Sequence, residues 1–171
     1  FVPQSCLPPT SACIGDARGF LTGILVMGPL MWLAILAIND AYDFEGDQQN
    51  PRKASHPLTA GRLSPRTVGI LAYTAAAIAF AASLTVSVSI AALTLAFLAL
   101  GWLYSVPPAR LKTRPGWDVA TNAVAVGVIA LLAGWTVARP LGEFPWLMAV
   151  LGLLVGSALY LPTTLADYDS D

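Results

Sequence analysis

The chain has 171 residues, of which 56% are hydrophobic and 11% are charged. Soluble domains carry about 25% charged residues, so this composition excludes an ordinary soluble domain and indicates an integral membrane protein. The net charge of −1 offers no broad basic surface, and we therefore exclude nucleic acid as a partner.

The start of the chain carries no recognisable targeting or metal-binding motif. No basic segment precedes an apolar core near Phe1, so we expect no signal peptide. Cys6 and Cys13 have no companion pair of cysteine or histidine, and their spacing does not predict a metal site. Because the sequence starts without methionine and stops inside an acidic cluster, we expect a piece of a longer protein, truncated at both ends.

Long uncharged segments follow one another along the chain. A membrane-spanning helix needs about 20 apolar residues, and several segments meet or approach that length. We expect an all-α, multi-span transmembrane helix bundle of about five helices, forming a single transmembrane domain over residues 1–171. The expected spans are residues 19–38, 67–84, 89–106, 119–138 and 144–166.

The order of the spans predicts which loops share a side of the membrane. The second and third spans leave and return to the side on which the first span ends, and the fourth and fifth do the same. Loops 39–66 and 106–118 and the end of the last span therefore share one side. These two loops hold seven of the nine lysines and arginines. Cytoplasmic loops carry such an excess, so we expect this side to be cytoplasmic.

An acidic segment, NDAYDFEGD (residues 39–47), directly follows the first span and holds four acidic residues in eight positions. Asn39, Asp43 and Asp47 are spaced i, i+4 and i+8. If the helix continues through them, all three lie along one face.

A second acidic segment, DYDSD (residues 167–171), follows the last span and repeats the i, i+4 spacing with Asp167 and Asp171. Carboxylates that converge raise one another's pKa, and a hard cation relieves this. Mg²⁺ prefers oxygen ligands and often binds carboxylates together with substrate phosphates. The pattern therefore predicts magnesium and a polyanionic substrate. The alternative is that these acids are solvated loop residues.

The segment YSVPPARLK (residues 104–112) follows the third span. Pro107 and Pro108 end the helix, and Arg110 and Lys112, which come directly after it, suit phosphate oxygens. Tyr104 adds a hydroxyl donor. The alternative is an interfacial tyrosine beside ordinary cytoplasmic cations.

The loop NPRKASHPLTAGR (residues 50–62) is stiffened by two prolines and carries Arg52, Lys53 and Arg62. It also holds His56, the only histidine. A lone histidine in a loop is more often a hydrogen-bonding or surface residue than a catalytic base.

Taken in order, NDAYDFEGD, HPLTAGRLS, YSVPPARLK and DYDSD resemble the UbiA superfamily of intramembrane prenyltransferases. The resemblance implies a bundle of nine spanning helices around a central cavity, of which this chain covers about helices two to six. It also implies Mg²⁺-dependent transfer of an isoprenyl group from a prenyl diphosphate to a lipophilic acceptor within the membrane. Loss of the remaining helices would open the cavity, so we expect this chain to be inactive alone.

The resemblance implies roles for the matching positions. The implied metal ligands are Asn39, Asp40, Asp43, Asp47, Asp167 and Asp171. The implied diphosphate-binding residues are Asn39, Tyr104, Arg110, Lys112, Arg52 and Lys53. The implied catalytic residues are Asp43, Asp47, Asp167 and Asp171. His56 stands where the family's loop usually has arginine, and a neutral imidazole there would weaken phosphate binding unless Arg52 or Lys53 replaces it.

Within the superfamily, the YSVPPARLK turn and the following Gly116-Trp117 resemble the chlorophyll-synthase and carotenoid-elongase branches. Two other classes stay open as alternatives. A membrane phosphotransferase of the CDP-alcohol type also uses aspartates and Mg²⁺, but its compact D-G-x-x-A-R element is absent from this sequence. A cation transporter usually places its acids near the middle of the bilayer in broken helices, whereas these lie at the ends of the expected spans.

Overall fold

The computed structural model describes residues 17–167, with side chains described for residues 17–162, and this part of the chain is helical without any strand. Helices α1 (Ala17–Leu25) and α2 (Met31–Asp47) form one rod, joined by the π-helical segment Val26–Leu30. The rod is followed by α3 (Pro65–Leu84), α4 (Val88–Ser105), α5 (Trp117–Val124), α6 (Ala130–Ala138) and α7 (Leu147–Asp167). Short 3₁₀ turns cover Pro51–Lys53, Leu111–Thr113 and Leu141–Glu143, and a second π-helical segment, Ala125–Ile129, joins α5 to α6. The predicted all-α fold class is confirmed.

The sequence explains where two of these helices begin and where the first rod bends. The Ser64 hydroxyl accepts a hydrogen bond from the Thr67 N–H at 3.0 Å and caps α3. Ser87 caps α4 in the same way, accepting from the Ile90 N–H at 3.1 Å. Serine is favoured at this position because its oxygen satisfies a backbone donor that the helix leaves unpaired. Pro29 lies within the π-helical segment of the first rod, where it removes a backbone donor and interrupts the regular ladder.

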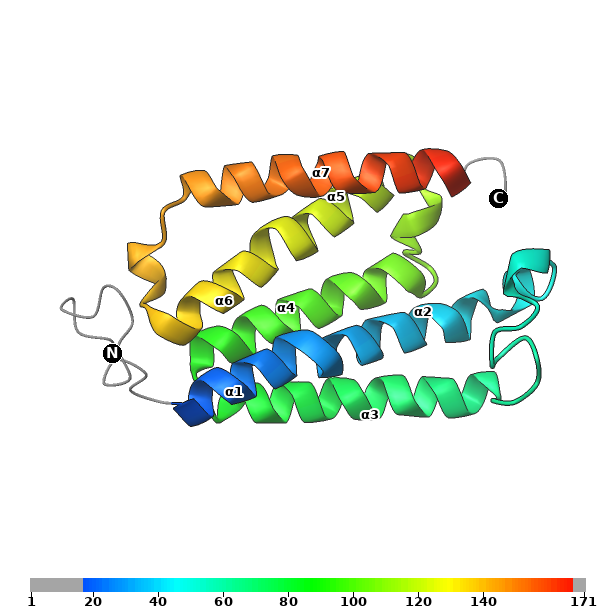
Figure 1. The fold of residues 1–171 in the computed structure, drawn as a ribbon, viewed down its shortest axis with the longest axis horizontal. Coiled ribbons are helices and arrows are strands. Elements are labelled where there is room, and N and C mark those ends of the chain that lie inside the picture. Colours follow the sequence, from blue (N-terminus) through cyan, green and yellow to red (C-terminus); the bar gives the residue numbers. More distant parts are fainter. Residues whose placement is uncertain (1–16, 168–171) are drawn as a thin grey trace.

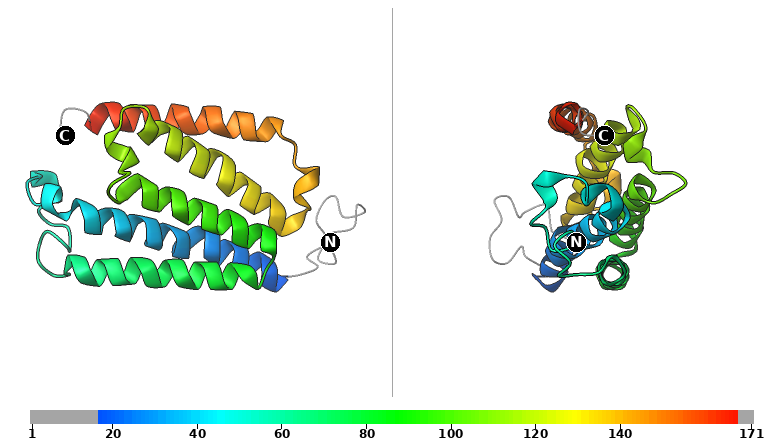
Figure 2. Two further views of the ribbon diagram at one scale, coloured as in Figure 1. Left: turned by 180° about the vertical axis from the view of Figure 1, so that it is seen from behind. Right: turned by 90° about the vertical axis from the view of Figure 1, so that its right-hand side faces the viewer.

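The helices lie side by side with their long axes roughly aligned (Figures 1 and 2). Helix α2 contacts both α3 and α4, α4 contacts α6, and α5 contacts α7. The last turn of α2, the loop 48–64, the loop 106–116 and the last turn of α7 all lie at the same end of the bundle (Figure 1). We call this the polar end.

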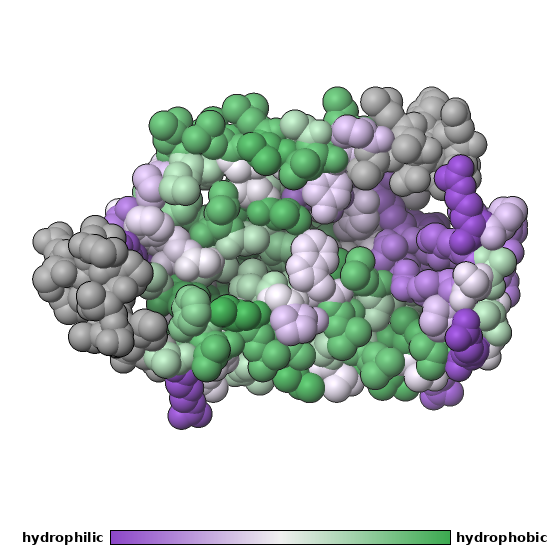
Figure 3. Space-filling model, in the orientation of Figure 1, coloured by the Kyte–Doolittle hydropathy of each residue, from purple (hydrophilic) through white to green (hydrophobic). Residues whose placement is uncertain are grey.

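Four helical segments are long and apolar enough to cross a membrane: Ala17–Asp47, Pro65–Leu84, Val88–Ser105 and Trp117–Ala138. The apolar part of α7 over Leu147–Pro162 is shorter. In the face shown in Figure 3, apolar residues cover the length of the helices and hydrophilic residues gather at the polar end. This distribution is that of a helical membrane protein with its polar chemistry concentrated at one end.

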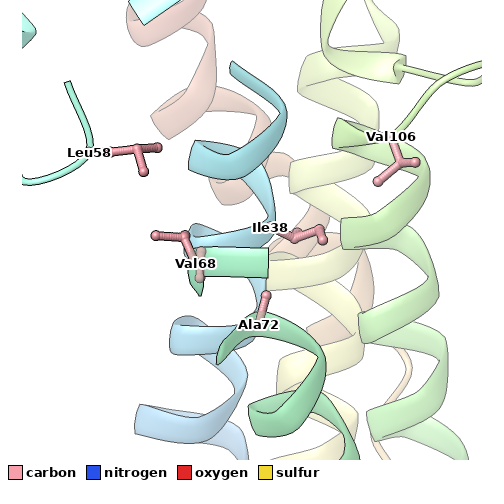
Figure 4. Close-up of a cluster of buried hydrophobic side chains, with 6 residues drawn as sticks. Ile38, Leu58, Val68, Ala72 and Val106 are labelled. Atoms are coloured by element: carbon pink, nitrogen blue, oxygen red, sulfur yellow. The ribbon is translucent and has the colours of Figure 1, made fainter. Parts of the chain in front are cut away.

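A cluster of buried apolar side chains lies beneath the polar end (Figure 4). Ile38 of α2 and Val68 of α3 belong to it, together with Leu58 from the loop 48–64 and Val106 from the turn after α4. Leu58 is 2% exposed and Val106 is 4% exposed. Because these two residues are held by the helices beneath them, both loops of the polar end are fixed to the frame rather than free in solvent.

Helix α7 packs against the π-helical segment Ala125–Ile129 through two facing glycines. A Cβ atom built on Gly152 would lie 2.6 Å from the Leu131 Cδ1 atom and would overlap the Gly127 carbonyl group. A Cβ atom built on Gly127 would likewise overlap the Gly152 carbonyl group. Small residues let membrane helices approach closely, and here the approach leaves no room for a methyl group.

We predict that Gly152→Ala in the full-length protein lowers the free energy of unfolding by about 1–3 kcal/mol, the usual cost of overpacking. The variant is measured by thermal unfolding in detergent. Gly134→Ala is the matched control, because a Cβ at that helical position meets nothing within 4 Å. Equal stability of the two variants would contradict the close packing of α7.

Candidate functional site

The last turns of α2 carry the first acidic segment into the polar end. Asn39 and Asp43 lie on one face of the helix, where both accept hydrogen bonds from the same residue, Lys112. The Asn39 Oδ1 atom accepts from the Lys112 Nζ atom at 2.8 Å and from the Ser105 hydroxyl at 3.1 Å. Asp43 forms ion pairs with Lys112 and, at 3.3 Å, with Arg110.

The turn after α4 places these cations over α2. Helix α4 ends at Ser105, and Arg110 then adopts a left-handed backbone conformation with φ of 40°. The 3₁₀ turn that follows directs Lys112 back toward α2, where its side chain is only 13% exposed. Burial lowers the pKa of the Lys112 ammonium below its ordinary value, although the hydrogen bond and charge of Asp43 act in the opposite direction.

The loop 48–64 supplies basic side chains to two further acids of α2, Asp47 and Asp40. The Lys53 Nζ atom donates to the Asp47 carboxylate at 2.7 Å, and His56 lies 3.7 Å from Asp40. Burial alone would lower the pKa of Lys53, but its hydrogen bond to Asp47 and the charges of Asp47, Asp43 and Asp40 together raise it.

The other expected loop cation lies apart from these pairs. Arg52 is exposed, and its backbone N–H donates to the Asn50 side chain. No hydrogen bond or ion pair of the Arg52 side chain is seen within the described part of the chain. The structure therefore brings Lys53, but not Arg52, into contact with the acids.

Tyr104 lies in the last turn of α4, next to the start of α5. Its hydroxyl interacts with the Asn122 side chain. The Asn122 amide also donates to the Asp118 carbonyl oxygen at 3.0 Å. Tyr104 thus links the last turn of α4 to the first turns of α5.

The second acidic segment lies at the limit of the described chain. Asp167 is the last residue of α7, but its side chain is outside the described set, and Asp169 and Asp171 lie outside the described residues. The last turns of α2 and α7 lie at the same end of the bundle (Figure 1). The site described above therefore contains no side-chain geometry from the second acidic segment.

The donor set at the polar end fits magnesium and phosphate chemistry. Its ligands are carboxylate and amide oxygens, which hard cations prefer, and Arg110 has a buried Nε atom that finds no partner among the described residues. A guanidinium with a spare donor is suited to an oxyanion. Within the described residues, no group of three or more His, Cys, Asp or Glu side chains is arranged to hold a metal ion. Three acids of α2, Asp40, Asp43 and Asp47, instead lie beside lysine, arginine or histidine side chains.

The sequence reasoning missed two buried residues of this region. Ser105 is fully buried and holds Asn39 through its hydroxyl. Asp118 is 7% exposed, and its Oδ1 atom has no hydrogen-bond partner in the described part of the structure. Ser105 lies inside the YSVPPARLK motif, so its position was a usable signal. Asp118 had no motif around it.

A helical bundle of membrane-crossing length, with facing acids and cations at one end, defines a helical membrane protein with a charged cluster at the bundle end. Comparison with known proteins identifies the family. The model of the UbiA prenyltransferase family matches residues 11–171. The chain belongs to this family.

The proteins that this chain resembles are considerably longer than it is. The lycopene elongase/hydratase of Haloarcula japonica is 31% identical over 122 residues, which are 68% of this chain and 41% of that protein. A UbiA homologue from Archaeoglobus fulgidus, bound to GPP and Mg²⁺, is 25% identical with a TM-score of 0.82, covering 91% of this chain and 54% of that chain. Its structure bound to Cd²⁺ is 24% identical with a TM-score of 0.75, covering 90% and 52%. The chain spans about half the length of the relatives it matches.

We predict that Ser105→Ala releases Asn39 and destabilises the full-length protein by about 1 kcal/mol, the net value of one hydrogen bond. The measurement is thermal unfolding in detergent. Ser157→Ala is the control, since the Ser157 hydroxyl donates to the Leu153 carbonyl oxygen of its own helix and has no other hydrogen bond among the described residues. A Ser105 variant that is no less stable than the control would show that the hydrogen bond to Asn39 contributes nothing to the stability of the protein.

Proposed function

We propose that the full-length protein transfers an isoprenyl group from a prenyl diphosphate to a lipophilic acceptor within the membrane, in a Mg²⁺-dependent reaction. The observation that carries the proposal is the convergence of Arg110 and Lys112, from the turn after α4, on Asn39 and Asp43 of α2. Family membership supports prenyl transfer in general. A solved relative bound to GPP and Mg²⁺ supports this donor class and this metal.

Arg110, Lys112 and Tyr104 are proposed to bind the diphosphate of the donor. As the C–O bond of the donor breaks, its electron pair leaves with the diphosphate, and cationic donors already in place stabilise the growing charge. The buried Arg110 Nε atom, which has no partner in the described part of the chain, is one such donor. Lys53 and Arg52 are proposed as further diphosphate contacts from the loop 48–64.

Asn39, Asp40, Asp43 and Asp47 would hold one magnesium ion, and Asp167 and Asp171 a second. When bound, magnesium supplies a Lewis acid that neutralises the leaving diphosphate. We propose Asp43, Asp47, Asp167 and Asp171 as the catalytic carboxylates. The apolar helix walls exclude water from the allylic carbocation, so that the acceptor forms the new bond to it and then loses a proton.

The similarity to a lycopene elongase/hydratase supports the carotenoid-elongase branch over the chlorophyll-synthase branch. The acceptor would then be a long, apolar lipid. Family membership counts against both alternatives, the CDP-alcohol phosphotransferase and the cation transporter. We also propose that the chain, which spans about half of its relatives, is inactive alone because the missing half would close the cavity.

The decisive experiment offers several prenyl diphosphates and candidate lipid acceptors to the full-length protein with Mg²⁺ and identifies the products. In that assay we predict that Asp43→Asn reduces transfer at least about 100-fold, the effect of losing one charged group from a preorganised site. Glu45→Gln, an exposed acid of the same helix, is the control and should keep full activity. Full transfer by the Asp43 variant would refute the metal-binding role.

We further propose that the expected spans (19–38, 67–84, 89–106, 119–138 and 144–166) cross the bilayer with the polar end on the cytoplasmic side. The test replaces Cys6 and Cys13 with serine and introduces one cysteine at a time. A thiol reagent that does not cross membranes should label Ala60→Cys from the cytoplasmic side and Gly142→Cys from the opposite side. The reverse labelling would overturn the orientation.

A further inference from the structure

Each carboxylate of the last turns of α2 whose contacts are described, apart from the exposed Glu45, already has a basic side chain beside it. Asp47 pairs with Lys53 and Asp40 lies beside His56. Asp43 has two cationic partners, Arg110 and Lys112. A divalent cation that approached this arrangement without an accompanying anion would meet compensated acids and nearby positive charge.

Lys112 is the cation that most directly competes with a metal. Its ammonium binds the Asn39 Oδ1 atom at 2.8 Å and also the Asp43 carboxylate. These two groups are among those proposed to hold magnesium. With a side chain only 13% exposed, Lys112 is poorly screened by water, so its charge acts strongly on any cation near the same oxygens.

We propose that Lys112 makes metal binding at the α2 acids depend on the prenyl diphosphate. This inference rests on the proposed function and concerns the regulation of the same site. Lys112 neutralises the Asn39–Asp43 face until the donor arrives, and the diphosphate then draws the ammonium to its own oxygens. Asn39 and Asp43 are released at the moment when the donor supplies the negative charge that a divalent cation needs. Metal and donor therefore bind together rather than one after the other.

A lysine is suited to this exchange. Its ammonium is a compact charge with three donors on a flexible stem, so it can bind an amide oxygen and a carboxylate and then turn to phosphate. Ser105 keeps its hydrogen bond to Asn39 throughout, because it comes from the end of α4 and not from the turn that carries Lys112.

The test measures binding rather than turnover, using the full-length protein in detergent. Binding of Mn²⁺ alone is followed by electron paramagnetic resonance, and binding of a thio analogue of geranyl diphosphate with Mg²⁺ is followed by calorimetry. We expect Lys112→Met to bind Mn²⁺ about tenfold more tightly than the wild type and the analogue about tenfold more weakly, since one charge-assisted contact is worth that much. Opposite signs are the signature of the exchange, because a merely structural lysine would weaken both.

Arg114→Met is the matched control. Arg114 lies in the same turn and is exposed, and its side chain donates to the Pro108 carbonyl oxygen at 3.3 Å. The control should leave Mn²⁺ binding unchanged, which separates a local effect from the loss of one positive charge. Lys112→Gln is measured in parallel and keeps the test decisive if the methionine variant does not fold.

Unchanged Mn²⁺ affinity in both Lys112 variants, or equal tightening in Arg114→Met, would overturn the inference while leaving prenyl transfer standing. Weaker binding of both Mn²⁺ and the analogue would also overturn it. If the wild type binds no Mn²⁺ even with the analogue present, the magnesium site of the proposed function itself fails.

Discussion

The ion pair between Lys112 and Asp43 is the contact on which the polar end depends. Charged groups at the edge of a membrane are costly unless they are paired, and removing one partner from a buried pair leaves an uncompensated charge. This pair joins the end of α2 to the turn after α4, 69 positions apart in the sequence. Because Lys112 also holds Asn39, one side chain sets the relative position of two separate elements of the site.

That contact is useful only because the helices beneath it are held in fixed positions. One buried apolar cluster contains Ile38 of α2, Leu58 of the loop 48–64 and Val106 of the turn after α4. Farther along the bundle, Gly127 and Gly152 bring α5–α6 and α7 into backbone contact. Apolar packing and the close approach at the two glycines therefore keep the ends of the helices in register, and the ion pair then links the polar residues that these ends carry.

The sequence predicted the parts of this structure that arise from local patterns. Long uncharged runs predicted an all-α bundle, which is confirmed, and the spacing of Asn39 and Asp43 placed both on one helix face. Local patterns could not say which cation meets which acid, because Lys112 and Lys53 reach α2 through the tertiary path of two loops. Asp118 was missed for the same reason, since its burial follows from the packing of α5. Pro29, which lies in the π-helical segment where the first rod bends, was visible in the sequence. It falls within an uncharged segment that composition alone predicts as one continuous span.

Arg110 and Lys112 reach the same carboxylate, but their environments differ in a way that separates their roles. Arg110 is 41% exposed and Lys112 is 13% exposed. A guanidinium holds its donors in a rigid fork and is suited to a lasting contact with an oxyanion, whereas an ammonium can change partners by rotating its stem. Arg110 also has an Nε donor without a partner among the described residues, so it can add an anion without giving up Asp43. Lys112 uses two of its three N–H donors on Asn39 and Asp43, so the third can contact an anion before the other two change partners. Arg110 is therefore placed to hold a diphosphate, and Lys112 to exchange its contacts with Asn39 and Asp43 for a diphosphate.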